Sequence, residues 1–139
     1  MNVEVYDYEG LGTIIDPESD TKVIPVILIG KQTVKCNPRP AVIYISGGKV
    51  TADCAEIEKY KAYCAENKIM LVCPVEAEDY DELGKTYAYL KKNYKDLNIL
   101  EDQISVKADE DKMEGAQNLI DYALDEYDTE LDEAEVFAV

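Results

Sequence analysis

The stretch Gln103–Leu124, with the sequence QISVKADEDKMEGAQNLIDYAL, predicts a strand, a sharp turn and a helix. QISVKA is a short strand pattern, and the segment after the turn places apolar residues at helical spacing. One side of that helix is expected to carry Met113, Ala116, Leu119, Ile120, Ala123, Leu124 and Tyr127. The turn KADEDK has three consecutive carboxylates and neither a serine nor a cysteine at its tip. These residues leave two interpretations open: an active site with unusual chemistry, or the remnant of a lost active site.

Strands and helices alternate around this unit. The apolar runs AVIYIS, residues 41–46, and IMLVCP, residues 69–74, are typical of strands buried on both faces. Helical spacing predicts a helix over residues 52–67, with Thr51 as its N-cap, and another over residues 79–97. The order predicts a three-layer α/β/α sandwich with a mostly parallel sheet and right-handed crossovers.

The first 40 residues predict additional strands at the start of a single domain spanning residues 1–139. Residues 2–8 alternate like a half-buried strand, and GLGTIIDPESD after them predicts turns. Residues 22–30 are apolar enough for a strand, although Pro25 indicates an edge position or a bulge. We therefore expect an N-terminal antiparallel hairpin over residues 1–40 and a βαβαβαβ core over residues 41–139, ending in the strand EVFAV.

Composition excludes several classes of function. The 139 residues carry a net charge of −16, which disfavours nucleic acids and anionic membranes and leaves a basic protein partner possible. The N-terminus lacks the plan of a signal peptide and no run has the ~18 apolar residues of a membrane span, so a cytoplasmic location is expected. The cysteines Cys36, Cys54, Cys64 and Cys73 form no CxxC pair and are expected to be reduced and mostly buried.

Histidine is absent from the chain. Its absence excludes a Ser-His-Asp or Cys-His triad within this chain, histidine metal sites and histidine general bases. Arg39 is the only arginine, so a multi-arginine phosphate clamp is excluded as well. We expect no cofactor and no metal.

Residues 41–124 resemble the N-terminal half of α/β-hydrolases, in particular the acetyl-esterase and hormone-sensitive-lipase-like group. That group typically has a strand, HGGG, a helix, a strand, a helix ending near a GIDPDRI-like loop, a strand and GDSAGG. In the same order, this chain has AVIYISGGK at residues 41–49, LNILEDQISV at residues 97–106 and KADEDKMEGA at residues 107–116. The resemblance implies an α/β-hydrolase-like half-fold with an esterase-like ancestry.

The departures from the family pattern fall at the positions that would carry the chemistry. The oxyanion segment becomes Ser46, Gly47, Gly48 and Lys49. At the turn, Asp109 matches the residue before the nucleophile, and Glu110 falls at the nucleophile itself. The family's acid and histidine follow later strands, which the 139 residues do not include. The resemblance thus implies a degenerate site and no catalytic residue.

Glu110 has two interpretations. Some α/β-hydrolases use a carboxylate at this turn, but they rely on a histidine to activate water for the second step. The simpler interpretation is that residues 109–111 form a charged helix start, where each carboxylate gains roughly 0.3–1 kcal/mol. Because Lys112 and Met113 replace small neighbours, the turn is expected to have relaxed into an ordinary loop. An ion pair between Lys49 and Glu110 would then replace the lost site, with Gly47 and Gly48 kept as a tight turn.

Between residues 108 and 135 only Lys112 offsets a run of carboxylates. No calcium-binding loop pattern is present, so a solvated or partner-facing surface is expected. The family's sheet continues beyond the position of EVFAV, and an apolar edge strand tends to be paired. We therefore expect a catalytically inactive protein that forms a homo-oligomer or binds a protein partner through residues 135–139. The alternatives are a hydrolase that uses Glu110 and a site that another chain completes.

Overall fold

The computed structural model describes residues 2–7, 12–15, 23–30, 37–47, 54–74 and 79–137. Within these ranges the chain forms β1 (Asn2–Asp7), β2 (Gly12–Ile15), β3 (Val23–Ile29), β4 (Arg39–Ile45), α1 (Ile57–Asn67), β5 (Met70–Pro74), α2 (Tyr80–Leu97), β6 (Ile99–Ala108), a 3₁₀ turn (Glu110–Lys112), α3 (Met113–Tyr127) and β7 (Glu135–Val136). The alternation predicted from residue 41 onward is confirmed.

The described strands form one sheet in the order β2-β1-β3-β5-β4-β6-β7. β1 pairs with β2, and β3 with β5, in antiparallel fashion, whereas the other neighbouring strands are parallel. The mostly parallel sheet with an N-terminal antiparallel hairpin is therefore confirmed, with a second antiparallel pair added. The expectation of turns throughout GLGTIIDPESD is wrong for Gly12–Ile15, which form β2.

Pro25 lies in a strand inside the sheet rather than at its edge. β3 pairs with β1 from Val23 onward, but its pairing with β5 begins only at Val26. Among the described residues, Pro25 therefore has a neighbouring strand only on the β1 side, and its missing N–H removes no hydrogen bond from the described β3–β5 ladder.

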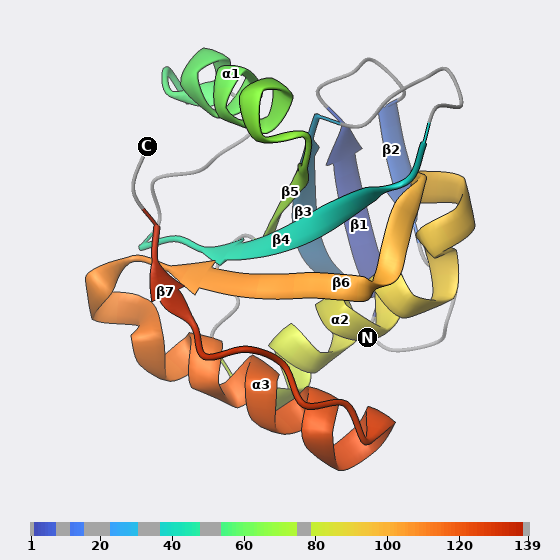
Figure 1. Cartoon of the computed structure of the whole chain (residues 1–139), viewed down its shortest axis with the longest axis vertical. Helices are drawn as coiled ribbons and strands as arrows, with labels where there is room; N and C mark the ends of the chain where they lie inside the picture. The colour runs from blue at the N-terminus through green and yellow to red at the C-terminus, as the bar shows by residue number, and fades with distance from the viewer. Residues whose placement is uncertain are drawn as a thin grey trace.

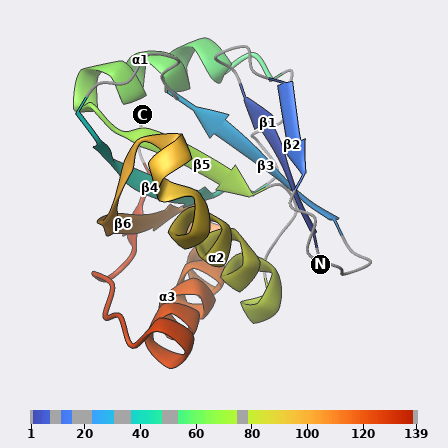
Figure 2. The same cartoon turned by 90° about the vertical axis from the view of Figure 1, so that its right-hand side faces the viewer.

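Helices cover both faces of the sheet (Figures 1 and 2), with α1 on one face and α2 and α3 on the other. Alternate residues of each central strand point to opposite faces, as the pleat requires. In β4, Ala41, Ile43 and Ile45 face α2 and α3, whereas Val42 and Tyr44 face α1. The three-layer architecture therefore buries every residue of the apolar run 41–45, as expected for a strand covered on both sides.

The helices begin and end close to the predicted residues, with one exception. Asp79 caps α2 because its side chain accepts a hydrogen bond of 2.8 Å from the Glu82 N–H. α1 begins only at Ile57, after Glu56 as N-cap, so the expectation of a helix over residues 52–67 is wrong for residues 54–56. Thr51 and residues 52–53 lie outside the described residues. Among the helices of the described ranges, none has the length and apolar character needed to cross a membrane.

α3 buries a narrower stripe than the pattern predicts. Ala116, Leu119 and Ala123 are fully buried against the sheet and α2, as expected. Leu124, however, is 49% exposed and Tyr127 is 37% exposed, so these two residues of the predicted apolar side do not belong to the buried stripe. The outer side of α3 therefore carries a large apolar side chain in solvent.

Candidate functional site

The carboxyl ends of β4, β6 and β7 meet at one end of the sheet, the position where ligands bind in open α/β folds. A hollow of about 560 Å³ lies there. Its lining among the described residues is Gly47, Asp109, Glu110, Asp111, Val136 and Phe137. The parallel topology thus brings the residue after β4 and the turn after β6 together, although they are far apart in sequence.

Asp109 is the central residue of this region. Its side chain is buried, with 8% of the residue exposed. One carboxylate oxygen accepts a hydrogen bond of 2.5 Å from the Tyr44 hydroxyl, and the other accepts one of 2.8 Å from the Gly47 N–H. Since both donors come from β4 and the residues after it, this carboxylate ties the turn after β6 to the end of β4.

The backbone of Asp109 strengthens the same connection. Its N–H donates to the Ile45 carbonyl at 3.0 Å, and its carbonyl accepts from the Lys112 N–H at 2.8 Å. Its side chain makes no hydrogen bond to the start of the 3₁₀ turn, and no side-chain cap precedes α3. The expectation that this carboxylate acts as a helix cap is therefore wrong, because the donors on β4 take it instead.

Glu110 and Asp111 are exposed and line the hollow from the 3₁₀ turn. The described non-glycine residues with positive φ are Lys68, Asn98 and Asp128, and none of them belongs to this turn. Asp109 has an extended backbone and Met113 a helical one. The turn has therefore relaxed into an ordinary strand-to-helix connection, as the large neighbours Lys112 and Met113 predict.

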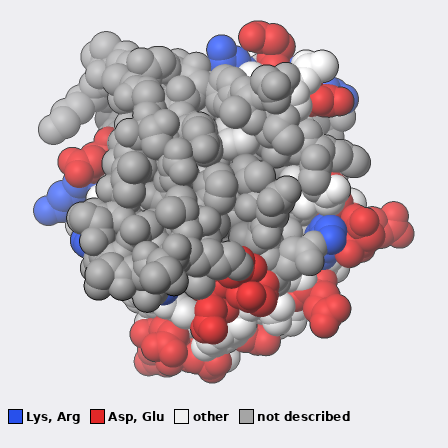
Figure 3. All heavy atoms as spheres, turned by 180° about the vertical axis from the view of Figure 1, so that it is seen from behind, with Lys and Arg blue, Asp and Glu red and all other residues white. Residues whose placement is uncertain are grey.

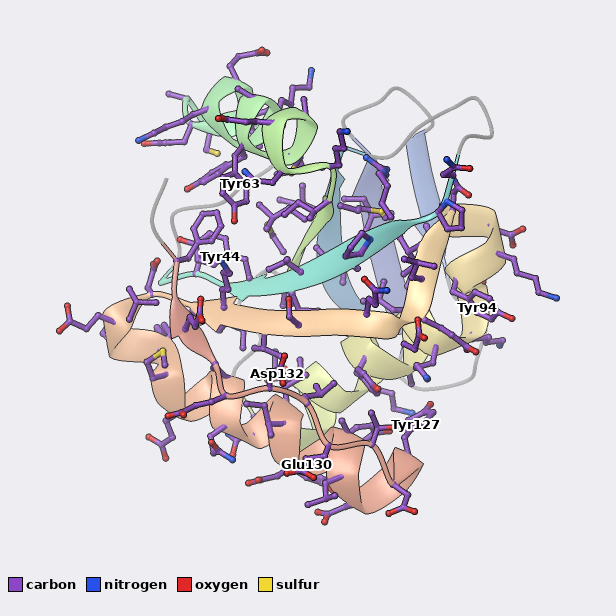
Figure 4. All side chains as sticks on the ribbon, in the orientation of Figure 1. Tyr44, Tyr63, Tyr94, Tyr127, Glu130 and Asp132 are labelled. Carbon is purple, nitrogen blue, oxygen red and sulfur yellow. The ribbon has the colours of Figure 1, made fainter. Side chains whose placement is uncertain are left out.

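An aromatic cluster closes the α1 side of the hollow. Phe137 stacks on Tyr44 with the ring centroids 4.2 Å apart. It also packs against Tyr63 in a T-shaped arrangement, with the ring centroids 5.2 Å apart. Figure 4 shows Tyr44 and Tyr63 on the same side of the sheet, between β4 and α1. Burial first, and then the hydrogen bond to Asp109, raise the pKa of Tyr44 well above its ordinary value of 10.0. This hydroxyl therefore stays protonated and donates to the carboxylate.

Comparison with known proteins gives matches in structure only. No protein-family model and no curated protein matches the sequence. An esterase from the archaeon Pyrobaculum calidifontis superposes on 78% of this chain with a TM-score of 0.55 and 16% identity. A thermostable carboxylesterase from a metagenomic library superposes on 92% with a TM-score of 0.58 and 14% identity. This chain has a partial α/β-hydrolase fold.

The chain spans less than half of the length of the proteins that it matches. The match covers 42% of the Pyrobaculum esterase and 42% of the metagenomic carboxylesterase. A bifunctional acetyl ester-xyloside hydrolase from Caldicellulosiruptor lactoaceticus gives a similar result, with 40% of that chain covered, a TM-score of 0.52 and 16% identity. These likenesses, at 14–16% identity, establish the α/β-hydrolase fold and nothing about activity.

Within the α/β-hydrolase fold, the predicted site residues are only partly brought together. Gly47 and Glu110 line the same hollow. Ser46 is half-buried at the end of β4, outside the lining of the hollow. Gly48 and Lys49 lie outside the described residues, and with them the expected ion pair between Lys49 and Glu110.

The sequence does not predict a role in this region for Tyr44 or Phe137. Its pattern places Tyr44 in an apolar strand and Phe137 in an edge strand. A tyrosine in an otherwise apolar buried run is itself a signal, because its hydroxyl needs a hydrogen-bond partner inside the protein. For Phe137 no comparable signal exists in the sequence.

Metal or thiol chemistry finds no support in the described ranges. No group of three or more acidic or cysteine side chains is placed there to hold a metal ion. Cys54, Cys64 and Cys73 form no disulfide bond within the described ranges, with Cys64 and Cys73 buried and Cys54 half-buried, as expected, whereas Cys36 lies outside the described residues. Burial raises the pKa of the Cys73 thiol, which keeps it in its unreactive form.

Proposed function

We propose that this chain is a catalytically silent α/β-hydrolase-like domain that acts by protein binding or self-assembly. The observation that carries the proposal is the 2.8 Å hydrogen bond from the Gly47 N–H to the Asp109 carboxylate. In the resembled esterases, N–H groups of the glycine segment would stabilise the anion that forms during acyl transfer. Here the protein's own carboxylate occupies the Gly47 donor, and its negative charge opposes the approach of a second anion.

The alternative function is a hydrolase that uses Glu110, which is exposed and lines the hollow. Its carboxylate oxygen would form a C–O bond to a haloalkane carbon as the halide leaves with the bonding electrons, or to an epoxide carbon as the ring opens. Either step leaves an alkyl ester on Glu110, which water must then hydrolyse. Because the chain has no histidine to activate that water, the ester would accumulate.

Turnover measurements separate the two functions. We expect no turnover above the buffer rate with p-nitrophenyl acetate and butyrate, 1-chlorobutane and styrene oxide. The intact mass should be unchanged after incubation, and Glu110→Gln should behave like the wild type. A rate that Glu110→Gln abolishes, or an adduct mapped to Glu110, would establish the hydrolase and end the proposal of a silent domain.

The proposed contact is the C-terminal strand, residues 135–139. β7 is the outermost described strand on its side of the sheet, and Val136 is 52% exposed. An edge of this kind pairs readily with another chain, and a lysine placed on it blocks such pairing. We expect light scattering to give a mass above that of one chain for the wild type and a monomer for Val136→Lys. Monomers in both samples would remove self-assembly from the proposal and leave binding of a different protein.

A further inference from the structure

The outer stripe of α3 is the most unusual exposed feature of the described surface. Residues at steps of three and four along a helix share one side. On the side of α3 opposite the core, all such residues are exposed, namely Glu114, Gln117, Asp121, Leu124, Asp125 and Asp128. Leu124 is thus a single large apolar side chain, 49% exposed, within an otherwise polar and acidic stripe.

The segment that follows α3 extends the same charge. It runs back alongside α3 to β7 (Figure 1), and Glu130 and Asp132 lie on it (Figure 4). Between residues 113 and 137 there are nine carboxylates and no lysine or arginine. All nine are exposed: Glu114, Asp121, Asp125, Glu126, Asp128, Glu130, Asp132, Glu133 and Glu135. Seen from behind, acidic side chains also gather over the lower part of the molecule (Figure 3), where α3 lies in Figure 1.

These carboxylates lie where they oppose the stability of the isolated helix. Asp125, Glu126 and Asp128 lie at the C-terminal end of α3, where the helix dipole favours cations, and the last turn has no basic residue. Asp121 and Asp125 form a like-charged pair at a spacing of four, which is also unfavourable. Gln117 donates to Asp121 at 2.9 Å and the Tyr80 hydroxyl donates to Asp125 at 3.0 Å. Both donors are neutral and leave the negative charge uncompensated, whereas a cation bound from outside would relieve it.

The large exposed apolar side chains lie in the same part of the chain as these carboxylates. Among the described residues, the exposed large apolar side chains are Leu124, Tyr127 and Val136, all in the same acidic part of the chain. Leu124 and Tyr127 are three residues apart on the last turns of α3. The ring of Tyr127 already has a cation beside it, since Lys91 Nζ of α2 lies 6.0 Å from its centroid.

We propose that this surface, the outer stripe of α3 together with residues 128–135, binds a lysine- or arginine-rich polypeptide segment that carries a large apolar side chain. The inference rests on the proposed binding function and names the chemistry of the partner. Charge complementarity supplies attraction from the eight carboxylates of this surface, of which only Glu135 has a described ion pair, 3.9 Å from Lys107 Nζ, and Leu124 supplies the apolar contact. A second copy that docks through this same surface does not fit, because it would bring the same negative charge against it.

The probe is the synthetic peptide KKLKKLKK, compared with KKSKKSKK of equal charge and length. We expect KKLKKLKK to bind in a calorimeter at low salt and the serine peptide to bind about tenfold more weakly. Leu124→Ser should lower the affinity for the leucine peptide by about the same factor and leave that for the serine peptide unchanged. Binding should weaken steeply as salt rises, since exposed charges are screened.

A matched pair of charge variants locates the binding surface. The first double variant removes two exposed carboxylates from the outer stripe, Asp121→Asn with Asp128→Asn. The second removes two exposed carboxylates from α1, Glu58→Gln with Glu66→Gln. Only the first double variant should lose several-fold in affinity. Equal losses in both, or identical binding of the two peptides, would show attraction to the overall charge and overturn the inference. The proposed absence of catalysis is decided separately, because peptide binding and ester turnover are independent measurements.

Discussion

The turn after β6 and the outer stripe of α3 are both acidic, but they hold their carboxylates in different ways. In the turn, Asp109 is buried and accepts hydrogen bonds from the Tyr44 hydroxyl and the Gly47 N–H. On α3, Asp121 and Asp128 are exposed, and no basic residue follows within residues 113–137. Asp109 thus has its charge satisfied by buried donors of the protein, whereas Asp121, which accepts only from the exposed Gln117, and Asp128 present their charge to solvent.

The difference separates a structural role from an available one. A buried carboxylate is tolerated only when hydrogen bonds compensate for the loss of water, so the donors around Asp109 are required by the fold. An exposed carboxylate keeps its hydration and adds little to stability, so its placement is free to serve a partner. In the turn that corresponds to the nucleophile turn of the family, Asp109 is thus used by the fold itself. The carboxylates available to a partner lie on the outer stripe of α3.

A large effect is expected to distinguish two neighbouring carboxylates, Asp109 and Glu110. Asp109→Ala leaves the Tyr44 hydroxyl and the Gly47 N–H without the acceptor they now share, and should lower the free energy of unfolding by about 3 kcal/mol. Glu110→Ala removes an exposed carboxylate and should change it by less than about 0.5 kcal/mol. Chemical denaturation followed by circular dichroism measures both values.

Tyr44→Phe is the control for this pair. It removes only the hydroxyl donor and keeps the ring stacked on Phe137, so its cost should fall between the two alanine variants. A stability of Asp109→Ala equal to that of Glu110→Ala would show that the buried carboxylate does not hold the turn to β4.

A second prediction compares the two sides of α3 with one residue type. Leu119 is fully buried in the core, whereas Leu124 is 49% exposed. Leu119→Ala should lower the free energy of unfolding by roughly 2–5 kcal/mol, because it leaves a cavity. Leu124→Ala should lower it by less than about 1 kcal/mol, since little buried area is lost. A large loss at Leu124 would give this side chain a structural role and weaken the case for a binding surface.

The sequence predicts the layers and the topology well and the site poorly. The apolar run 41–45 and the stripe of α2 follow from burial on one or two faces, which periodicity reports directly. The hydrogen bonds of Asp109 could not be predicted in this way, because Tyr44 and Gly47 are more than 60 residues away along the chain. Local reasoning assigned the carboxylate to the nearest N–H groups, and the tertiary structure supplied better donors.

The exposure of Leu124 is a second feature that the sequence pattern does not predict. A helical apolar pattern gives the residues that could face the core, but the width of the buried stripe depends on what packs against the helix. α3 approaches α2 closely at Gly84, where an added Cβ would lie 2.2 Å from the Tyr122 ring. This contact fixes which side of α3 faces inward, and the sequence of α3 alone does not contain it.

The smallest expected effect concerns pH and tests the buried carboxylate from the donor side. The pKa of Tyr44 is raised in the folded protein by burial and by Asp109, so above pH 10 the unfolded chain loses this proton before the folded one does. The unfolded state then binds fewer protons, and stability falls as pH rises, by at most about 1.4 kcal/mol per pH unit for one tyrosine. Tyr44→Phe removes this contribution, so denaturation between pH 9 and 11 should give a shallower decline than in the wild type. Equal slopes would mean that the Tyr44 hydroxyl ionises as readily in the folded protein as in the unfolded chain, and that the contact with Asp109 is open to solvent like the carboxylates of α3.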